Sequence, residues 1–275
     1  DGVNPANGVV IYYNLTDSAE VKLVIKDSQG NEVRSFTSEK DKSYKRYDGG
    51  PPAEPTLSNN KGLNRFVWDM RYPTADGIPL AYIEGSYRGH KAIPGKYTIH
   101  LSVKGQEVAS ELNILPNPLY ETTMETYKEY HTFMLSMEKE IDIMHKMVNK
   151  ISGLRSKLEE VLNGPLAKSG NKELMLNATD LIAKMKSWDE DMVQRKAKAY
   201  DDVDNFENKF TANYIYMINQ TESDLPKVNE PSRARYKELM AEWKKLAERG
   251  NEMIEKDIPT FNKLLWDAGI GVIHN

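Results

Sequence analysis

The sequence predicts an α+β protein with two modules, a strand-rich one over residues 1–118 and a helical one over residues 119–275. The main observation is a change of periodicity at Pro116-Asn117-Pro118. Before this point, short apolar runs alternate with Gly, Pro, Asn and Asp, and after it apolar residues recur at helical spacing. The second observation is length, because 275 residues leave room for two ordinary domains.

Six short strands are expected in the first module, each an apolar or alternating run bounded by turn residues. They lie at residues 9–13, 21–26, 33–38, 62–69, 96–103 and 108–115. Gly30 is expected to supply the positive φ of the hairpin between the second and third strands. Six such strands in succession predict an immunoglobulin-like β-sandwich with Trp68 at the centre of its core.

Two connections in this module are long, residues 39–61 and residues 71–93, and we call them the first loop and the second loop. Long loops are often functional, and exposed Tyr and Arg are typical of recognition surfaces. The candidate ligand-binding residues are therefore Tyr44, Tyr47, Tyr72, Tyr82, Tyr87, Arg88 and His90. The alternative is that both loops pack against a neighbouring domain.

A heptad pattern predicts a long helix near residues 120–162, with Tyr127, Tyr130, Met134, Met137, Ile141, Met144, Val148 and Ile151 along one seam. Asn163-Gly164-Pro165 is expected to end it. Further helices are expected near residues 174–192, around residues 214–218, and from Pro231 to a point near Pro259, followed by an apolar tail over residues 261–266. Short connections make neighbouring helices antiparallel, so the second module is expected to be an antiparallel long-helix bundle.

Composition and spacing exclude several kinds of chemistry. The chain has no cysteine, and 37 basic residues against 41 acidic ones leave no surplus for binding nucleic acid. No run approaches the length of a membrane span. The five histidines are scattered, and His131 and His145 lie too far apart along one helical face to share a metal. No cofactor is expected. The acidic cluster Asp201, Asp202 and Asp204 is a weak candidate for a metal site, and the main alternative is a solvated loop that caps a helix.

Several segments resemble a known family. Residues 4–13 are similar to the opening of the C-terminal region in bacterial sortilin-like β-propeller proteins, which are often labelled glycosyl-hydrolase-like for their neuraminidase-type repeats. Residues 62–73, 94–98 and 261–265 match the same region in order. The resemblance implies a large exported protein whose propeller precedes this sequence. Residues 1–8 have the composition of a linker that enters a strand, which predicts a start inside a longer gene product or after a processed leader. Residues 82–90 depart from it, standing where the family has a shorter loop.

The leading hypothesis is a non-catalytic C-terminal accessory region that supports an upstream β-propeller and offers a surface to a protein or glycan. The motivation is the resemblance together with the absence of any catalytic grouping in the sequence. One alternative is a carbohydrate-binding module that stacks the Tyr and His side chains of the two loops on sugar rings. A second alternative is a part of a glycoside hydrolase whose active site lies in the propeller. No residue of this sequence is assigned a catalytic role.

Overall fold

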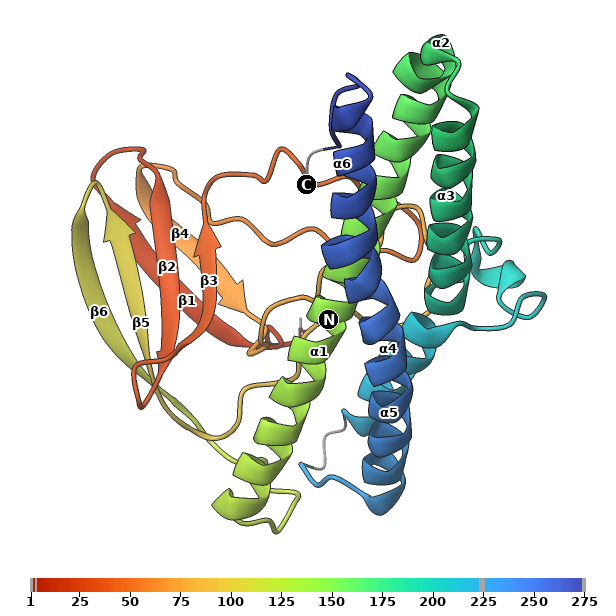
Figure 1. Cartoon of the computed structure of the whole chain (residues 1–275). Helices are drawn as coiled ribbons and strands as arrows, with labels where there is room; N and C mark the ends of the chain where they lie inside the picture. Colours follow the sequence, from red (N-terminus) through yellow and green to blue (C-terminus); the bar gives the residue numbers. More distant parts are fainter. Residues whose placement is uncertain (1, 3, 223–225, 274–275) are drawn as a thin grey trace.

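The computed structural model describes residues 2, 4–222 and 226–273 (Figure 1). It confirms the coarse expectation of an α+β protein, with two antiparallel sheets in the N-terminal half and a helical C-terminal half. The two long loops cross the space between the sheets and the helices in Figure 1. The position of these loops beside the helices creates the candidate functional site.

The six expected strands are all present. One sheet pairs β1 (Val9–Leu15) with β4 (Gly62–Trp68). The other sheet contains β2 (Val21–Asp27), β3 (Glu32–Thr37), β5 (Gly95–Val103) and β6 (Gln106–Ile114). Its strand order is β3-β2-β5-β6. Gly30 has φ 84°, as the β2–β3 hairpin requires. Alternate residues of β2 are fully buried, which is the pattern of a strand with one face toward a core.

Both sheets contribute to one hydrophobic cluster. Tyr13 and Phe66 come from the two-stranded sheet, and Leu23 and Ile25 come from the four-stranded one. Trp68 is completely buried within this cluster, and its indole N–H donates to the Arg71 carbonyl at 3.1 Å. The expected burial of Trp68 in the core of the strand-rich half is therefore confirmed.

The long helix α1 spans Met124–Val161, and Thr123 caps it by accepting from the Thr126 amide. All eight residues of the expected seam are buried, so the methionines on it belong to the core. The expected end at Asn163-Gly164-Pro165 is wrong. These residues form one π-helical turn, Leu162–Leu166, which leads into α2 (Ala167–Ser169), and Gly170 with φ 67° ends the helix.

A similar turn changes the expected end near Pro259. Helix α5 spans Glu230–Glu252 and continues through a π-helical turn, Met253–Asp257, into α6 (Ile258–Asp267). The Ile258 amide donates to the Met253 carbonyl, five residues earlier, which is the π-helical spacing. Proline lacks an amide hydrogen, so a wider turn just before Pro259 lets the helix pass it instead of stopping. Figure 1 shows α5 and α6 following each other along one line.

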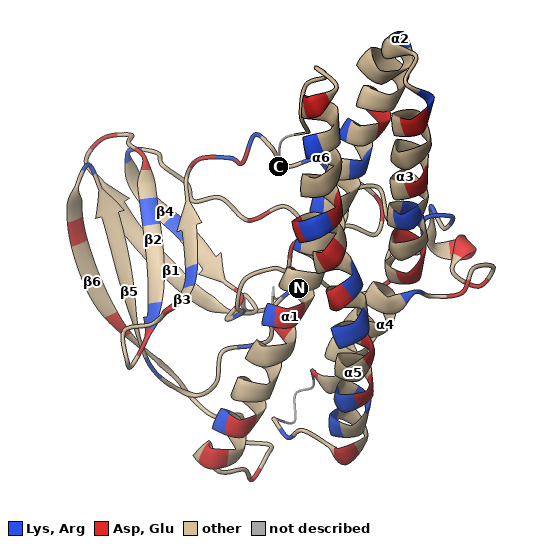
Figure 2. Ribbon diagram, in the orientation of Figure 1, with Lys and Arg blue, Asp and Glu red and all other residues tan. Residues whose placement is uncertain are grey.

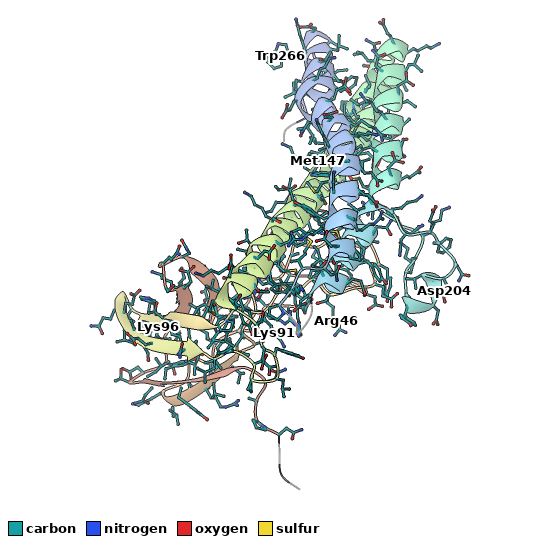
Figure 3. All side chains as sticks on the ribbon, turned by 90° about the horizontal axis from the view of Figure 1, so that it is seen from below. Arg46, Lys91, Lys96, Met147, Asp204 and Trp266 are labelled. Carbon is teal, nitrogen blue, oxygen red and sulfur yellow. The ribbon has the colours of Figure 1, made fainter. Side chains whose placement is uncertain are left out.

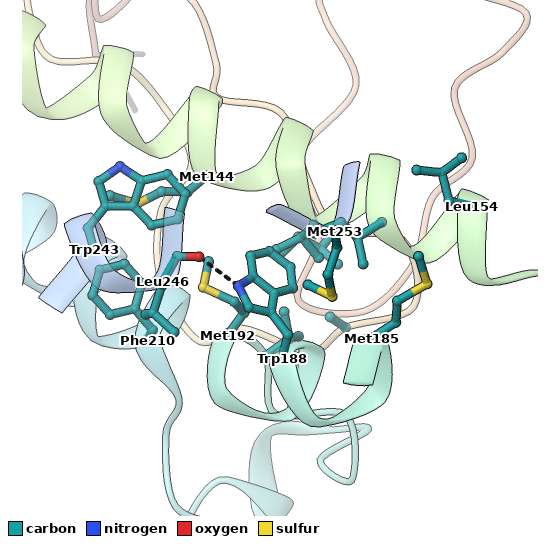
Figure 4. Close-up of a cluster of buried hydrophobic side chains, with 14 of the residues drawn as sticks. Met144, Leu154, Met185, Trp188, Met192, Phe210, Trp243, Leu246 and Met253 are labelled. Atoms are coloured by element: carbon teal, nitrogen blue, oxygen red, sulfur yellow. Dashed lines mark hydrogen bonds between the residues drawn. The ribbon is translucent and has the colours of Figure 1, made fainter. Parts of the chain in front are cut away.

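The other helices surround α1 and α5. Helix α3 (Lys172–Met192) contacts α1, α5 and α6, and the short α4 (Phe210–Thr221) contacts α1 and α5. Figure 4 shows Trp188 of α3 buried among Met185, Met192, Leu246 and Met253, with its indole N–H donating to the Leu246 carbonyl at 2.8 Å. Figure 2 shows acidic and basic residues interspersed along these helices, without one region of a single sign. In the apolar tail, Phe261 and Leu265 are buried, whereas Trp266 points away from the helices (Figure 3).

Candidate functional site

A stripe of polar residues on α1 holds the second loop. His131, Glu138 and His145 follow one another at seven-residue spacing, next to the buried apolar seam. Seven residues are close to two helical turns, so these side chains lie on one face of the helix. Each of them contacts a residue of the second loop, and we call the three the polar stripe.

At one end of the stripe, His90 of the second loop is completely buried and lies against Glu138. The Glu138 Oε1 atom accepts from the His90 amide at 2.7 Å and lies 2.9 Å from the His90 Nδ1 atom. The His90 Nε2 atom is 2.8 Å from the His131 Nδ1 atom, and the His131 Nε2 atom is 3.5 Å from the Tyr72 hydroxyl. The Tyr72 ring stacks on the His90 ring, with centroids 4.6 Å apart and planes 3° apart.

The Glu138 carboxylate assigns one hydrogen in this network. A carboxylate only accepts, so the His90 Nδ1 atom donates to Glu138. Burial, and after it the neighbouring His90, lowers the pKa of His131 to about 4. The His131 ring is therefore neutral near pH 7, so one of its nitrogens donates and the other accepts.

At the other end of the stripe, α1 binds the backbone of the second loop directly. The His145 Nδ1 atom contacts the Asp76 carbonyl at 2.5 Å, and the side-chain amide of Asn149 donates to the Gly77 carbonyl at 2.9 Å. The Asp76 amide donates to Asp142 Oδ1 at 3.0 Å. Successive turns of α1 thus satisfy backbone groups that have no partner within the loop.

Helix α4 holds the same loop from a second side. Asn219 accepts from the Ser86 amide at 2.7 Å and donates to the Ser86 carbonyl at 2.9 Å, as a neighbouring strand would. The Arg71 Nη1 atom lies 2.7 Å from Glu222 Oε1, and both side chains are only about one-fifth exposed. The second loop is therefore attached to two helices by charged and neutral hydrogen bonds.

These contacts overturn the expected exposure of three candidate ligand-binding residues. Tyr72, Tyr87 and His90 are 9%, 4% and 0% exposed. The side chains of Tyr87 and of Ile78, which lie on the same loop, belong to the core of the helical half. Stacking on a sugar needs an open ring face, so these three residues provide no platform for one. The second loop packs against the helices, as the alternative interpretation holds.

The four other loop candidates lie at or near the surface. Arg88 is exposed, and the half-buried Tyr82 lies against the backbone of Gly49 in the first loop. Tyr44 and Tyr47 are half-buried and line a cleft of about 870 Å³ between the first loop and residues 74–79 of the second. The structure therefore divides the candidates between a buried attachment and an open cleft.

The acidic cluster gathers no set of metal ligands. Asp202 accepts from the amides of Lys198 and Ala199 and so caps the short 3₁₀ turn Tyr200–Asp202. Asp204 lies at the tip of a segment that projects from the helices (Figure 3), and Asp201 is exposed. Over residues 2, 4–222 and 226–273, no three His, Asp or Glu side chains are placed to hold a metal ion.

Sequence reasoning missed Glu138 and the contact between His90 and His131. Forty-one residues separate the two histidines, so no local motif joins them. The available signal is the seven-residue spacing of His131, Glu138 and His145 beside an apolar seam. Polar residues at a position next to a buried seam need partners, and a loop rich in backbone donors and acceptors can supply them.

No protein-family profile, no curated protein and no solved structure matches this chain. Within the described ranges, no helix is both long enough and apolar enough to cross a membrane.

Proposed function

We propose that this chain is a non-catalytic accessory region of a larger exported protein, in which the sheets and the helices form one brace beside an upstream β-propeller. The observation that carries the proposal is the attachment of the second loop, which inserts its side chains into the helical core and is bonded to α1 and α4. An attachment of this kind makes the two halves a single mechanical unit. The resemblance of residues 62–73 and 94–98 to the sortilin-like family supports the propeller and the export.

We also propose that the two sheets form an immunoglobulin-like sandwich and the long helices an antiparallel bundle, with the boundary near residue 118. The single hydrophobic cluster shared by both sheets supports the sandwich. The cluster shared by α1, α3, α4, α5 and α6 supports the bundle. Ile78, Ala81, Ile83 and Tyr87 precede that boundary but join the helical cluster, so the second loop connects the two units.

The size of the native protein tests the proposed context. An immunoblot of the source cells with an antibody raised against this chain should give a band far above 31.4 kDa, enriched in the exported fraction. A band near 31.4 kDa, or one confined to the cytoplasm, would contradict an accessory region of an exported protein.

Coupled unfolding tests the brace. Hydrogen exchange followed by mass spectrometry during a urea titration reports β2, β5, α1 and α3 separately. All four should lose protection at one urea concentration, because the second loop joins their cores. Sheets that unfold at clearly lower urea than the helices would show that the attachment does not couple the halves.

A carbohydrate-binding function remains as a second candidate, and one observation favours it. The cleft between the two loops has the volume of a small-ligand site, and two of the predicted tyrosines line it.

A further inference from the structure

The cleft between the loops is bounded by rings and prolines on rigid supports. Ser35, Phe36 and Thr37 of β3 form one border, and Tyr44, Tyr47 and the prolines at 51, 52, 55 and 79 form much of the wall. Its volume of about 870 Å³ lies within the range of roughly 300–1,000 Å³ that small-molecule sites occupy. Flat rings and prolines present the C–H and π surfaces on which a sugar ring can lie.

The two tyrosines are fixed in place. The Tyr44 hydroxyl donates to the Pro51 carbonyl at 3.0 Å. The Tyr47 ring lies so close to Gly50 that a Cβ atom there would be 2.5 Å from its Cζ atom, and its hydroxyl lies against Gly77. Side chains held by packing lose little conformational entropy when a ligand binds, so this wall is preorganised.

Several buried polar atoms lack a hydrogen-bonding partner among the residues that the structure describes. They include the hydroxyl oxygens of Tyr47 and Tyr87 and the Nε2 atom of His145, and the rings of Tyr87 and His145 are 6.1 Å apart. Since the Nδ1 atom of His145 donates to the Asp76 carbonyl, its Nε2 atom is an acceptor. Only Tyr47 of these three also lines the cleft. A buried hydroxyl without a partner costs stability, which a ligand hydroxyl at this position would offset.

The charges along the cleft balance. Glu54 forms an ion pair with Arg34, and Asp76 lies 3.7 Å from Lys146. The remaining charged residues of the lining are Lys40, Lys45, Glu39 and Asp41, two of each sign. A cleft with balanced charge and with polar groups that are mostly hydrogen-bonding acceptors and hydroxyls suits a neutral ligand rich in hydroxyl groups.

We propose that this cleft binds a neutral oligosaccharide, with a sugar ring on the tyrosine and proline wall and a sugar hydroxyl bonded to Tyr47. The inference rests on the second candidate function, carbohydrate binding, and names the class of ligand and the residues that bind it. It restricts the carbohydrate-binding hypothesis to the residues at the cleft, because Tyr72, Tyr87 and His90 serve the attachment of the second loop.

Isothermal titration calorimetry on the full chain tests the proposal. The neutral probes are β-linked hexasaccharides of glucose, of xylose and of N-acetylglucosamine, and an α-linked hexasaccharide of glucose. Hexagalacturonate is the anionic comparison. At least one neutral hexasaccharide should bind saturably at micromolar to millimolar concentration, and hexagalacturonate should not. Tyr47→Phe should weaken binding about five- to tenfold, because it removes one hydrogen bond and leaves the ring in place. Tyr87→Phe is the matched control, since it removes an equally buried hydroxyl outside the cleft and should leave binding unchanged.

A second pair of variants covers the case in which Tyr47→Phe perturbs the fold. Ala53 is an exposed residue of the lining, so Ala53→Trp should block the cleft and abolish binding, whereas Asn59→Trp, exposed on the same loop outside the cleft, should not. Failure of every neutral hexasaccharide to bind would overturn the proposal, as would binding that survives Ala53→Trp or a preference for hexagalacturonate. None of these outcomes affects the size of the native protein or the coupled unfolding of its two halves. The accessory role is therefore tested independently of the cleft.

Discussion

The contact between His90 and Glu138 should be the strongest single polar link between the second loop and α1. His90 is completely buried, the Glu138 side chain is 15% exposed, and one carboxylate oxygen faces two donors of His90 at 2.7 and 2.9 Å. Glu138→Ala leaves both donors in a site that water does not reach. A buried donor that loses its acceptor costs about 1–3 kcal/mol, so for two donors we expect a loss of about 2–5 kcal/mol in the free energy of unfolding.

Urea denaturation followed by tryptophan fluorescence and by circular dichroism measures this loss. Glu138→Gln keeps an oxygen at the Oε1 position, which both donors already face, so it should lose much less stability than Glu138→Ala. The matched surface control is Glu107→Ala, which removes a contact of the same 2.9 Å length to His100 from a side chain that is 56% exposed. That exposed contact should contribute little. If Glu138→Ala is no more destabilising than Glu107→Ala, the network does not attach the loop and our reasoning is wrong.

Three further predictions concern acid stability and packing. His131 has a pKa of about 4 in the folded state, far below its usual value near 6.5, so between these pH values unfolding takes up a proton. The free energy of unfolding should therefore fall by up to about 3 kcal/mol as the pH drops from 6.5 to 4. Urea midpoints measured across this pH range should show the fall, and His131→Gln should reduce it. Gly77→Ala would place a Cβ atom 2.5 Å from the Pro51 Cδ atom and closer still to the Tyr47 hydroxyl. Thermal unfolding should therefore show a loss of about 1–3 kcal/mol in the free energy of unfolding. The loss should be smaller in a Tyr47→Phe background, which lacks the hydroxyl. Trp188→Phe removes a buried indole and its bond to the helix α5 carbonyl, and chemical denaturation should show a cost of about 2–3 kcal/mol, whereas equal stability would mean that the core refills the space.

Much of the fold could be predicted because its elements are local in origin. Strand β2 alternates between apolar and polar residues, and the α1 seam repeats at three and four residues, so each pattern predicts its own element. Trp68 was correctly placed in a core because few exposed strands carry so large an apolar ring. The predicted helix ends were wrong at Pro165 and near Pro259, because proline normally breaks a helix and the π-helical turns that accommodate it leave no clear sequence signal.

The site could be predicted only in part. Residue type and place in a long loop predict Tyr44 and Tyr47 as ligand-binding residues, and both line the cleft. The same reasoning predicts an exposure of Tyr72, Tyr87 and His90 that these residues lack. Tyrosine and histidine are amphipathic, so their presence in a long loop does not show whether the loop faces water or a neighbouring helix. That choice depends on which residues of the helix can pair with the loop.

Local pattern therefore determines the strands, the helices and the buried seam of this protein, since period and turn residues act over a few positions along the chain. The tertiary structure alone decides that His90 meets Glu138 and His131, that Asn219 pairs with Ser86, and that the first loop faces residues 74–79 across a cleft. These partners are separated by many residues in sequence, and only the packing of the second loop on α1 and α4 brings them together. The same packing buries one group of aromatic residues and leaves the other open to a ligand.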